Sequence, residues 1–166
     1  ARSAVGKYPA NYFDLVIVEP PSPPLAAYAP GHFDVVWASP PCTEYSRALT
    51  TRPPLMEEAD QRVLAALRVI TYLQPAYWYI ENPEGRLKER GIMQALEQHR
   101  HTTFYYHYGT AYHTRTHIWT NAALRTPLRL CSKADPCPNR AKAGRHPVTA
   151  QSGPSRGGGA RERKRR

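Results

Sequence analysis

Two residues that could act in catalysis, Cys42 and Glu81, each follow a short apolar run of the sequence. Cys42 stands directly behind Pro40 and Pro41, whose rings fix their own φ angles and restrict the residue before each of them. A thiol on such a stiff turn is a candidate nucleophile, because cysteine thiolates attack electrophilic carbon readily. A buried structural cysteine is the alternative interpretation, and the position behind an apolar run favours the nucleophile.

Glu81 directly follows the apolar run 77–80 and precedes Asn82-Pro83. A carboxyl group at the end of a buried strand is costly unless it is paired, hydrogen-bonded or functional. Such an acid is a candidate for proton transfer to a bound substrate. A carboxylate that only caps the following loop is an equally good interpretation of Glu81 taken alone.

The elements that must position these residues alternate between strands and helices. Apolar and β-branched runs predict strands over residues 13–18, 33–38, 77–80, 102–108 and 116–120. Helical spacing of apolar residues predicts one helix over 57–73 and a second over 92–99. This order is typical of a mostly parallel sheet with helices on both faces, an α/β fold of three layers, α/β/α.

In such a sheet, ligands bind at the carboxyl ends of the strands. Cys42 follows one predicted strand, and Glu81 with Asn82 follows the next, so we expect the two segments to meet at one edge of the sheet. The runs that begin at Phe13 and Phe33 also repeat each other, and each reaches Pro-Pro seven residues after its Phe. Two similar strands of one sheet explain this repeat.

Three segments resemble motifs of the cytosine-C5 DNA methyltransferases, and their order and spacing match as well. Residues 33–42, Phe-Asp-Val-Val-Trp-Ala-Ser-Pro-Pro-Cys, with Ser46 behind them, resemble the Pro-Cys motif of that family. Residues 79–83, Tyr-Ile-Glu-Asn-Pro, resemble its Glu-Asn-Val motif, and residues 109–121 resemble its Gln-x-Arg-x-Arg segment. The likeness is to short, phage-type members and covers roughly residues 31–121.

The resemblance implies a partial Rossmann-like, S-adenosylmethionine-dependent methyltransferase core over residues 1–130. The Cys42 thiolate would attack C6 of a cytosine, Glu81 would hold N3, and C5 would take the methyl group from S-adenosylmethionine. Arg115 would contact the base or the DNA backbone, and Asn82 would shape the loop of Glu81. The base must be flipped out of the duplex to be reached, at a cost that phosphate contacts help to offset.

The resemblance also implies the remaining contacts of the site. Cofactor contacts would come from Asp14, Ser39 and Pro40. Substrate contacts would come from Pro41, Ser46, Asn82 and His117. His117 replaces the last arginine of the family segment, and His113 replaces its glutamine.

The family's glycine-rich cofactor turn, Phe-x-Gly-x-Gly, is absent before Cys42. We therefore expect the chain to begin after the first strands of the fold, so that a missing N-terminal segment or a partner chain completes the cofactor site. The first hypothesis is a DNA (cytosine-5-)methyltransferase that acts in this way. The second is a truncated, inactive methyltransferase-like module that binds DNA, and the third is a related fold that modifies bases differently.

The net charge of +10 lies entirely in residues 125–166, because residues 1–124 carry equal numbers of acidic and basic side chains. The basic, Pro/Gly/Arg-rich segment over 131–166, which we expect to be disordered from residue 151, suits a polyanion such as the DNA backbone. A solvated tail that only keeps the protein soluble is the alternative. The final run 161–166 could equally be a nuclear-localisation patch.

No run of 18 apolar residues predicts a membrane span, and no N-terminal segment indicates secretion. Three cysteines at irregular spacing do not form a disulfide framework, which favours an intracellular setting: a bacterial or phage-infected cytoplasm, or a eukaryotic nucleus. Cys131, Cys137 and His146 raise the question of zinc. Their spacing is wider than the Cys-x2-Cys of most zinc sites, and no metal is expected.

Overall fold

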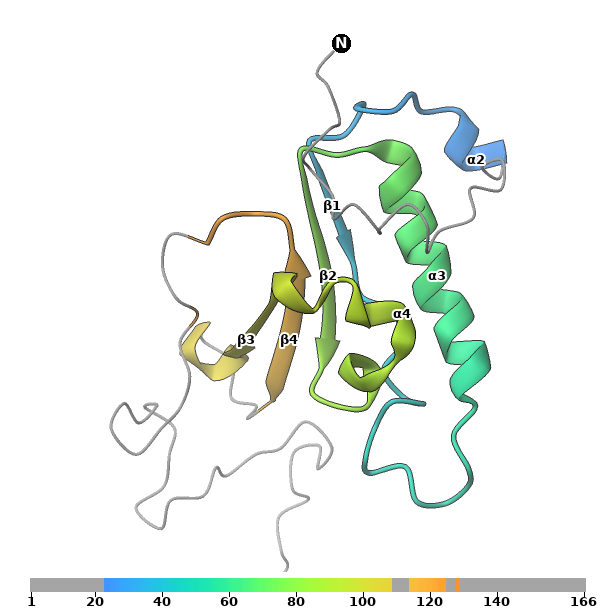
Figure 1. Cartoon of the computed structure of the whole chain (residues 1–166), viewed down its shortest axis with the longest axis vertical. Coiled ribbons are helices and arrows are strands. Elements are labelled where there is room, and N and C mark those ends of the chain that lie inside the picture. The colour runs from blue at the N-terminus through green and yellow to red at the C-terminus, as the bar shows by residue number, and fades with distance from the viewer. Residues whose placement is uncertain (1–22, 109–113, 125–127, 129–166) are drawn as a thin grey trace, which may run out of the picture. The chain divides into compact units, whose positions relative to one another are not determined.

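The computed structural model describes residues 23–108, 114–124 and 128 of the chain (Figure 1). The strand predicted over 13–18 and the basic segment predicted over 131–166 lie outside the described residues.

The chain divides into two compact units. The first unit comprises Ala1–Thr103 and Arg115–Leu128, and the second comprises Phe104–Thr114 and Arg129–Arg166. Both motif segments, with Cys42 and Glu81, belong to the first unit, which is described below by itself.

A four-stranded sheet in the order β1-β2-β4-β3 carries the motifs (Figure 1). Its strands are β1 (Val35–Ala38), β2 (Tyr77–Pro83), β3 (Arg100–Phe104) and β4 (Arg115–Thr120). β1 and β2 run parallel, whereas β2 and β4 run antiparallel. The α/β class is confirmed. Within the described residues the sheet is mixed and not mostly parallel as predicted, because β4 adds to β2 in the opposite direction. The three-layer, Rossmann-like arrangement stays a prediction.

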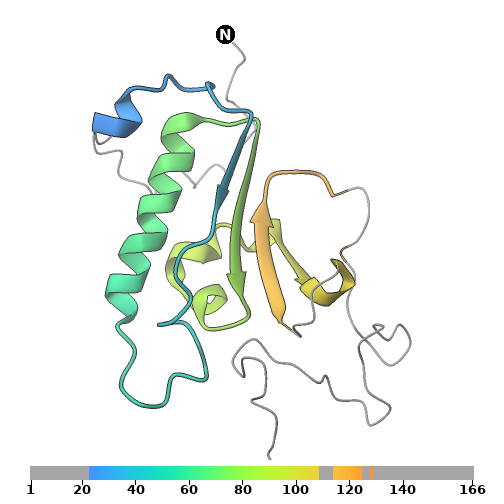
Figure 2. The ribbon, with the colours of Figure 1, turned by 180° about the vertical axis from the view of Figure 1, so that it is seen from behind.

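Helix α3 (Met56–Leu73) joins the two parallel strands as their crossover connection and lies along them in both views (Figures 1 and 2). Its buried residues recur at helical spacing, as the predicted helix over 57–73 required. Gln74 ends it in the left-handed conformation (φ 46°), where its N–H donates to the Ile70 carbonyl at 3.0 Å. Among the described helices, none has the length and apolar character to cross a membrane.

The short helix α2 (Pro23–Ala26) precedes the sheet, and the turn after it is tied to the carboxyl end of α3. The Tyr72 hydroxyl donates to the Tyr28 carbonyl at 3.1 Å, and the Gly31 N–H donates to the Leu73 carbonyl at 2.6 Å. Gly31 has a φ of 81°, which a side chain would make costly. These bonds set the point at which the chain enters β1.

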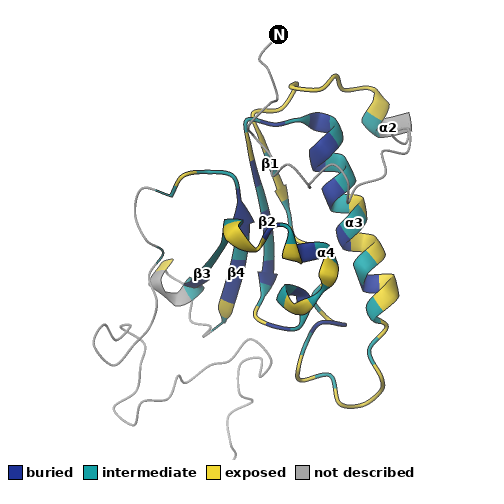
Figure 3. Ribbon diagram, viewed as in Figure 1, coloured by how far each residue is buried: buried dark blue, intermediate teal, exposed yellow. Residues whose placement is uncertain are grey.

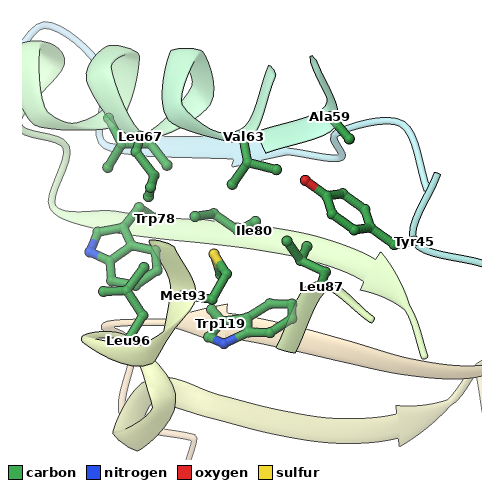
Figure 4. Packing of buried hydrophobic residues seen from close by; sticks show 11 residues of the cluster. Tyr45, Ala59, Val63, Leu67, Trp78, Ile80, Leu87, Met93, Leu96 and Trp119 are labelled. Carbon is green, nitrogen blue, oxygen red and sulfur yellow. The ribbon is translucent and has the colours of Figure 1, made fainter. Parts of the chain in front are cut away.

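The hydrophobic core fills the space between α3 and one face of the sheet (Figure 4). Val63 and Leu67 of α3 lie over Trp78 and Ile80 of β2, and Trp119 of β4 is completely buried beside them. Burial of each such side chain contributes roughly 1.5–3 kcal/mol. This packing fixes how far β2 and β4 can move relative to the helix.

The other face of β1 and β2 is open to solvent in the described structure (Figure 3). Val35, Trp37 and Tyr77 are about half exposed, at 53%, 54% and 50%. Trp37 stacks on Tyr79, with ring centroids 5.3 Å apart. The prediction of helices on both faces of the sheet is therefore not met in the described residues, since no described helix covers this face.

Short turns replace the second predicted helix. Residues 92–99 form α4 (Gly91–Gln94) and the 3-10 turn η2 (Glu97–His99), after a similar turn η1 (Leu87–Glu89). Leu87, Met93 and Leu96 of this region are buried in the core. The strand predicted over 102–108 also differs, since β3 ends at Phe104 and the 3-10 turn η3 (Tyr105–Tyr108) follows.

Candidate active site

The turn that carries Cys42 begins where β1 ends. Pro40 is buried, Pro41 is exposed, and the Cys42 thiol is free and partly buried. The Tyr45 N–H donates to the Cys42 carbonyl at 3.1 Å, and the Ser46 N–H donates to the Thr43 carbonyl at 3.2 Å. Two prolines and two turn hydrogen bonds thus hold the cysteine backbone.

Tyr45 anchors this turn in the core, where the residue is 1% exposed. Its hydroxyl donates to Asp60 Oδ1 of α3 at 2.9 Å, and Arg90 donates to the same carboxylate at 2.6–3.2 Å. Burial, together with the hydrogen bond to Asp60, raises the pKa of Tyr45. The Tyr45 hydroxyl therefore stays protonated and remains a hydrogen-bond donor over the physiological pH range.

Glu44 holds the loop that runs from the turn to α3. Arg52 Nη1 donates to Glu44 Oε2 at 2.9 Å, and the Leu55 N–H donates to the same oxygen at 2.7 Å. These bonds, that of Arg52 first, lower the pKa of Glu44 from 4.5 to about 2. The carboxylate is thus ionised whenever the loop is in this conformation at neutral pH.

Glu81 and Asn82 lie within β2, because pairing with β4 extends that strand to Pro83. This corrects the prediction that the strand ends before Glu81. Glu81 stands opposite Ile118 and is partly buried, on the same face of the sheet as Tyr79. Asn82 points to the other face and is completely buried.

The side chain of Asn82 connects the two motifs. Its Nδ2 donates to the Pro40 carbonyl at 2.8 Å, two residues before Cys42. The expectation that the two segments meet at the carboxyl ends of neighbouring parallel strands is confirmed by this bond and by the pairing of Ala38 with Ile80.

Gly85, which the sequence reasoning missed, brings the second motif against the first. A Cβ at this position would lie 2.5 Å from the Tyr45 carbonyl oxygen. The Arg86 N–H donates to that oxygen at 2.8 Å, and Arg86 Nη1 donates to the Ser46 carbonyl at 3.1 Å. A glycine four residues after Glu81 was the available sequence signal.

Arg115 and His117 of β4 lie beside this region but have different surroundings. Arg115 is exposed, and its Nη1 lies 3.4 Å from Glu84 Oε1. His117 is 1% exposed and stands opposite Asn82, on the face of the sheet away from Glu81. Burial, with Arg100 nearby, lowers the pKa of His117 to about 4, so the ring is neutral at pH 7.

The remaining predicted residues either have other partners or lie outside the described residues. Ser39 is exposed, and its Oγ accepts the Trp37 indole N–H at 2.9 Å. Asp14 lies outside the described residues, as do Cys131, Cys137 and His146. Within the described ranges, no group of three His, Cys, Asp or Glu side chains could hold a metal ion.

Comparison with known proteins gave one informative similarity. No protein-family model matches the chain. The chain is 35% identical over 124 residues to a protein of Frog virus 3 (isolate Goorha) named "Probable DNA (cytosine-5)-methyltransferase". The aligned residues cover 66% of this chain and 56% of the viral protein, so the chain spans little more than half the length of that relative.

Proposed function

Since the chain belongs to the cytosine-C5 DNA methyltransferase family, we propose that it forms the catalytic part of a DNA (cytosine-5-)methyltransferase. The observation that carries the proposal is the bond from Asn82 Nδ2 to the Pro40 carbonyl, 2.8 Å long and buried. It ties the strand of Glu81 to the turn of Cys42, as a site in which both side chains act on one base requires.

The proposed reaction begins with addition of the Cys42 thiolate to C6 of a flipped cytosine. Glu81 holds N3 and shares a proton with it, so that the electron pair pushed into the ring is available at C5. S-adenosylmethionine, when bound, supplies the methyl group. Loss of the C5 proton to a base then expels the Cys42 thiolate from C6, which regenerates the free cysteine.

The described residues fit one side of a cofactor site. The exposed face of β1 offers Val35 and Trp37 as an apolar surface for an adenosyl group. The Ser39 hydroxyl accepts from Trp37 and keeps its own proton for donation, and Pro40 follows at the strand end. We propose Ser39 and Pro40 as part of this site, with Asp14 and a preceding segment or partner chain completing it.

DNA is the proposed macromolecular partner. A base must leave the duplex to reach Cys42, and opening costs a few kcal/mol. Exposed Arg115, together with Pro41 and Ser46 near the thiol, supports contact with the extruded nucleotide. The basic residues after position 125 suit contacts with flanking phosphates.

The second candidate function is a DNA-binding module without catalytic activity. It is favoured by the basic residues after position 125, which suit phosphate contacts that need no catalysis. Titration calorimetry with S-adenosylmethionine separates the two. If millimolar cofactor gives no heat of binding, the chain does not catalyse methylation by itself.

Mechanism-based trapping tests the catalytic proposal. DNA that contains 5-fluorocytosine should form a covalent adduct with the protein in the presence of S-adenosylmethionine. A base cannot remove fluorine from C5 as it removes a proton, so the thiolate is not expelled and the adduct persists. We expect the adduct, seen as a band shift in a denaturing gel, with the wild type and none with Cys42→Ser. DNA affinity of the serine variant serves as the control for folding. An adduct that survives the serine substitution would exclude Cys42 as the nucleophile.

A further inference from the structure

Asn82 Oδ1 and His117 Nε2, on facing strands, are among the buried polar atoms that lack a hydrogen-bond partner in the described structure. Asn82 of β2 and His117 of β4 are directly opposite in the register and are 0% and 1% exposed. Side chains at such positions start from Cβ atoms about 4.5–5.5 Å apart. Leaving both atoms unsatisfied is costly, because no bulk water reaches them.

The surroundings of the His117 ring determine which nitrogen carries its proton. Thr102 Oγ1 lies 3.0 Å from Nδ1, and Arg100 Nη1 lies 3.4 Å from the same atom. A guanidinium group only donates, so Nδ1 must accept. The lowered pKa of His117, about 4, keeps the ring neutral at pH 7, and its single proton is therefore on Nε2.

The orientation of the Asn82 amide is determined in the same way. The Pro40 carbonyl can only accept, so the Asn82 atom 2.8 Å from it must be the amino group. The atom left over, Oδ1, is an acceptor. The two atoms without partners are thus a donor and an acceptor on opposite residues.

We propose that His117 is a positioning residue, whose Nε2–H satisfies Asn82 Oδ1 through one buried water and thereby holds the turn that carries Cys42. The connection runs from His117 to Asn82, and from Asn82 to the Pro40 carbonyl. This inference rests on the proposed function of Cys42. It assigns His117 to the support of the nucleophile, in place of the substrate contact that the sequence resemblance implied.

Glu84 is the competing acceptor. Its Oε1 lies 4.0 Å from His117 Nε2, which is beyond hydrogen-bond distance. The same oxygen is 3.4 Å from both Lys88 Nζ and Arg115 Nη1, and the side chain is 30% exposed. Glu84 therefore has cations and water to bind, whereas Asn82 Oδ1 is shielded from both.

The tautomer of His117 can be measured without any activity. In nitrogen-15 NMR of the full chain at pH 7, with the signal assigned by its loss in His117→Gln, we expect a protonated Nε2 and an unprotonated Nδ1. The Nε2 proton should exchange slowly with solvent, and Glu84→Gln should leave both features unchanged. A proton on Nδ1, or fast exchange at Nε2, would overturn the proposal whether or not the chain is a methyltransferase.

Trapping kinetics test the positioning role. His117→Gln retains an amide donor, so we expect its adduct to form within about threefold of the wild-type rate, whereas His117→Leu should be slower by about tenfold or more. DNA affinity should stay within about twofold for both, since neither touches the DNA. Equal loss of affinity in both variants would identify a substrate contact and overturn the proposal, as would an unchanged rate in His117→Leu. If the leucine variant does not fold, His117→Phe, which keeps a ring but has no donor, replaces it with the same expected result.

Discussion

Asn82 and Gly85 join the two sequence motifs at the scale of single residues. Asn82 reaches across the sheet end to the Pro40 carbonyl, and Gly85 lets the backbone after Glu81 approach the Tyr45 carbonyl. Neither residue is a candidate for chemistry itself. Their effect is to fix the relative positions of a thiol and a carboxylate that lie 39 residues apart in the sequence.

Gly85→Ala is predicted to destabilise the protein. The new methyl group would lie 2.5 Å from the Tyr45 carbonyl, so the backbone of the Cys42 loop or of residues 84–86 must shift. We expect a loss of about 1–3 kcal/mol in the free energy of unfolding, measured with urea and tryptophan fluorescence. Gly91→Ala is the matched control, since nothing lies within 4 Å of its added Cβ. Equal effects of the two substitutions would contradict the close approach.

The sequence indicates the candidate reactive residues, but it does not indicate the contacts that join them. Cys42 and Glu81 are visible because a thiol behind two prolines and an acid behind an apolar strand are unusual. The bond from Asn82 to Pro40 spans 42 residues, and no local pattern signals it. The burial of His117 was also not visible, because the alternation of one strand does not tell which neighbouring element covers it.

At the scale of elements, the loop between the Cys42 turn and α3 is held at its start by two side chains. Tyr45 binds Asp60 of α3, and Glu44 binds Arg52 and the Leu55 N–H just before the helix. Helix α3 therefore does more than cover the sheet. Through Asp60 it also anchors the segment that follows Cys42.

The Glu44 anchor predicts a pH dependence of stability. The pKa of Glu44 is about 2 in the folded chain and 4.5 ordinarily, so its contribution is complete above pH 4.5 and is lost as the pH falls toward 2. Glu44→Gln should reduce the slope of the unfolding free energy against pH in this window. Arg52→Gln should reduce the slope less, because the Leu55 N–H still binds the carboxylate, and the double variant should match Glu44→Gln. A full slope retained in Glu44→Gln would exclude the anchor.

Helices and strands could be predicted where the spacing of apolar residues agrees with the packing of the folded chain. The amphipathic pattern of α3 gave its bounds to within one residue, since Val63, Leu67 and Ile70 face the core throughout. The helix predicted over 92–99 was wrong, because Met93 and Leu96 are buried by a short helix, α4, and a separate 3-10 turn, η2. The extension of β2 to Pro83 depends on pairing with β4, which is distant in sequence.

At the scale of the whole molecule, charge and catalytic motifs occupy different parts of the chain. Residues 1–124 are neutral overall, and the excess of ten positive charges follows them. Under the proposed function, this basic segment suits contacts with the phosphates of DNA. Affinity should then come mainly from the basic segment, and base selection from the motif-bearing unit.

Deletion of residues 151–166 tests this division of roles. The segment contains six Lys/Arg and one Glu, so its removal should weaken DNA binding and lower the salt dependence. If each cation releases about one counterion, the slope of log K against log salt should fall by several units, up to about five. A variant with the same sixteen residues in scrambled order keeps the charge and should keep the slope. Fluorescence anisotropy with a labelled duplex across a salt series measures both the DNA affinity and its salt dependence. An unchanged slope in the deletion variant would mean that this segment does not contact the phosphates.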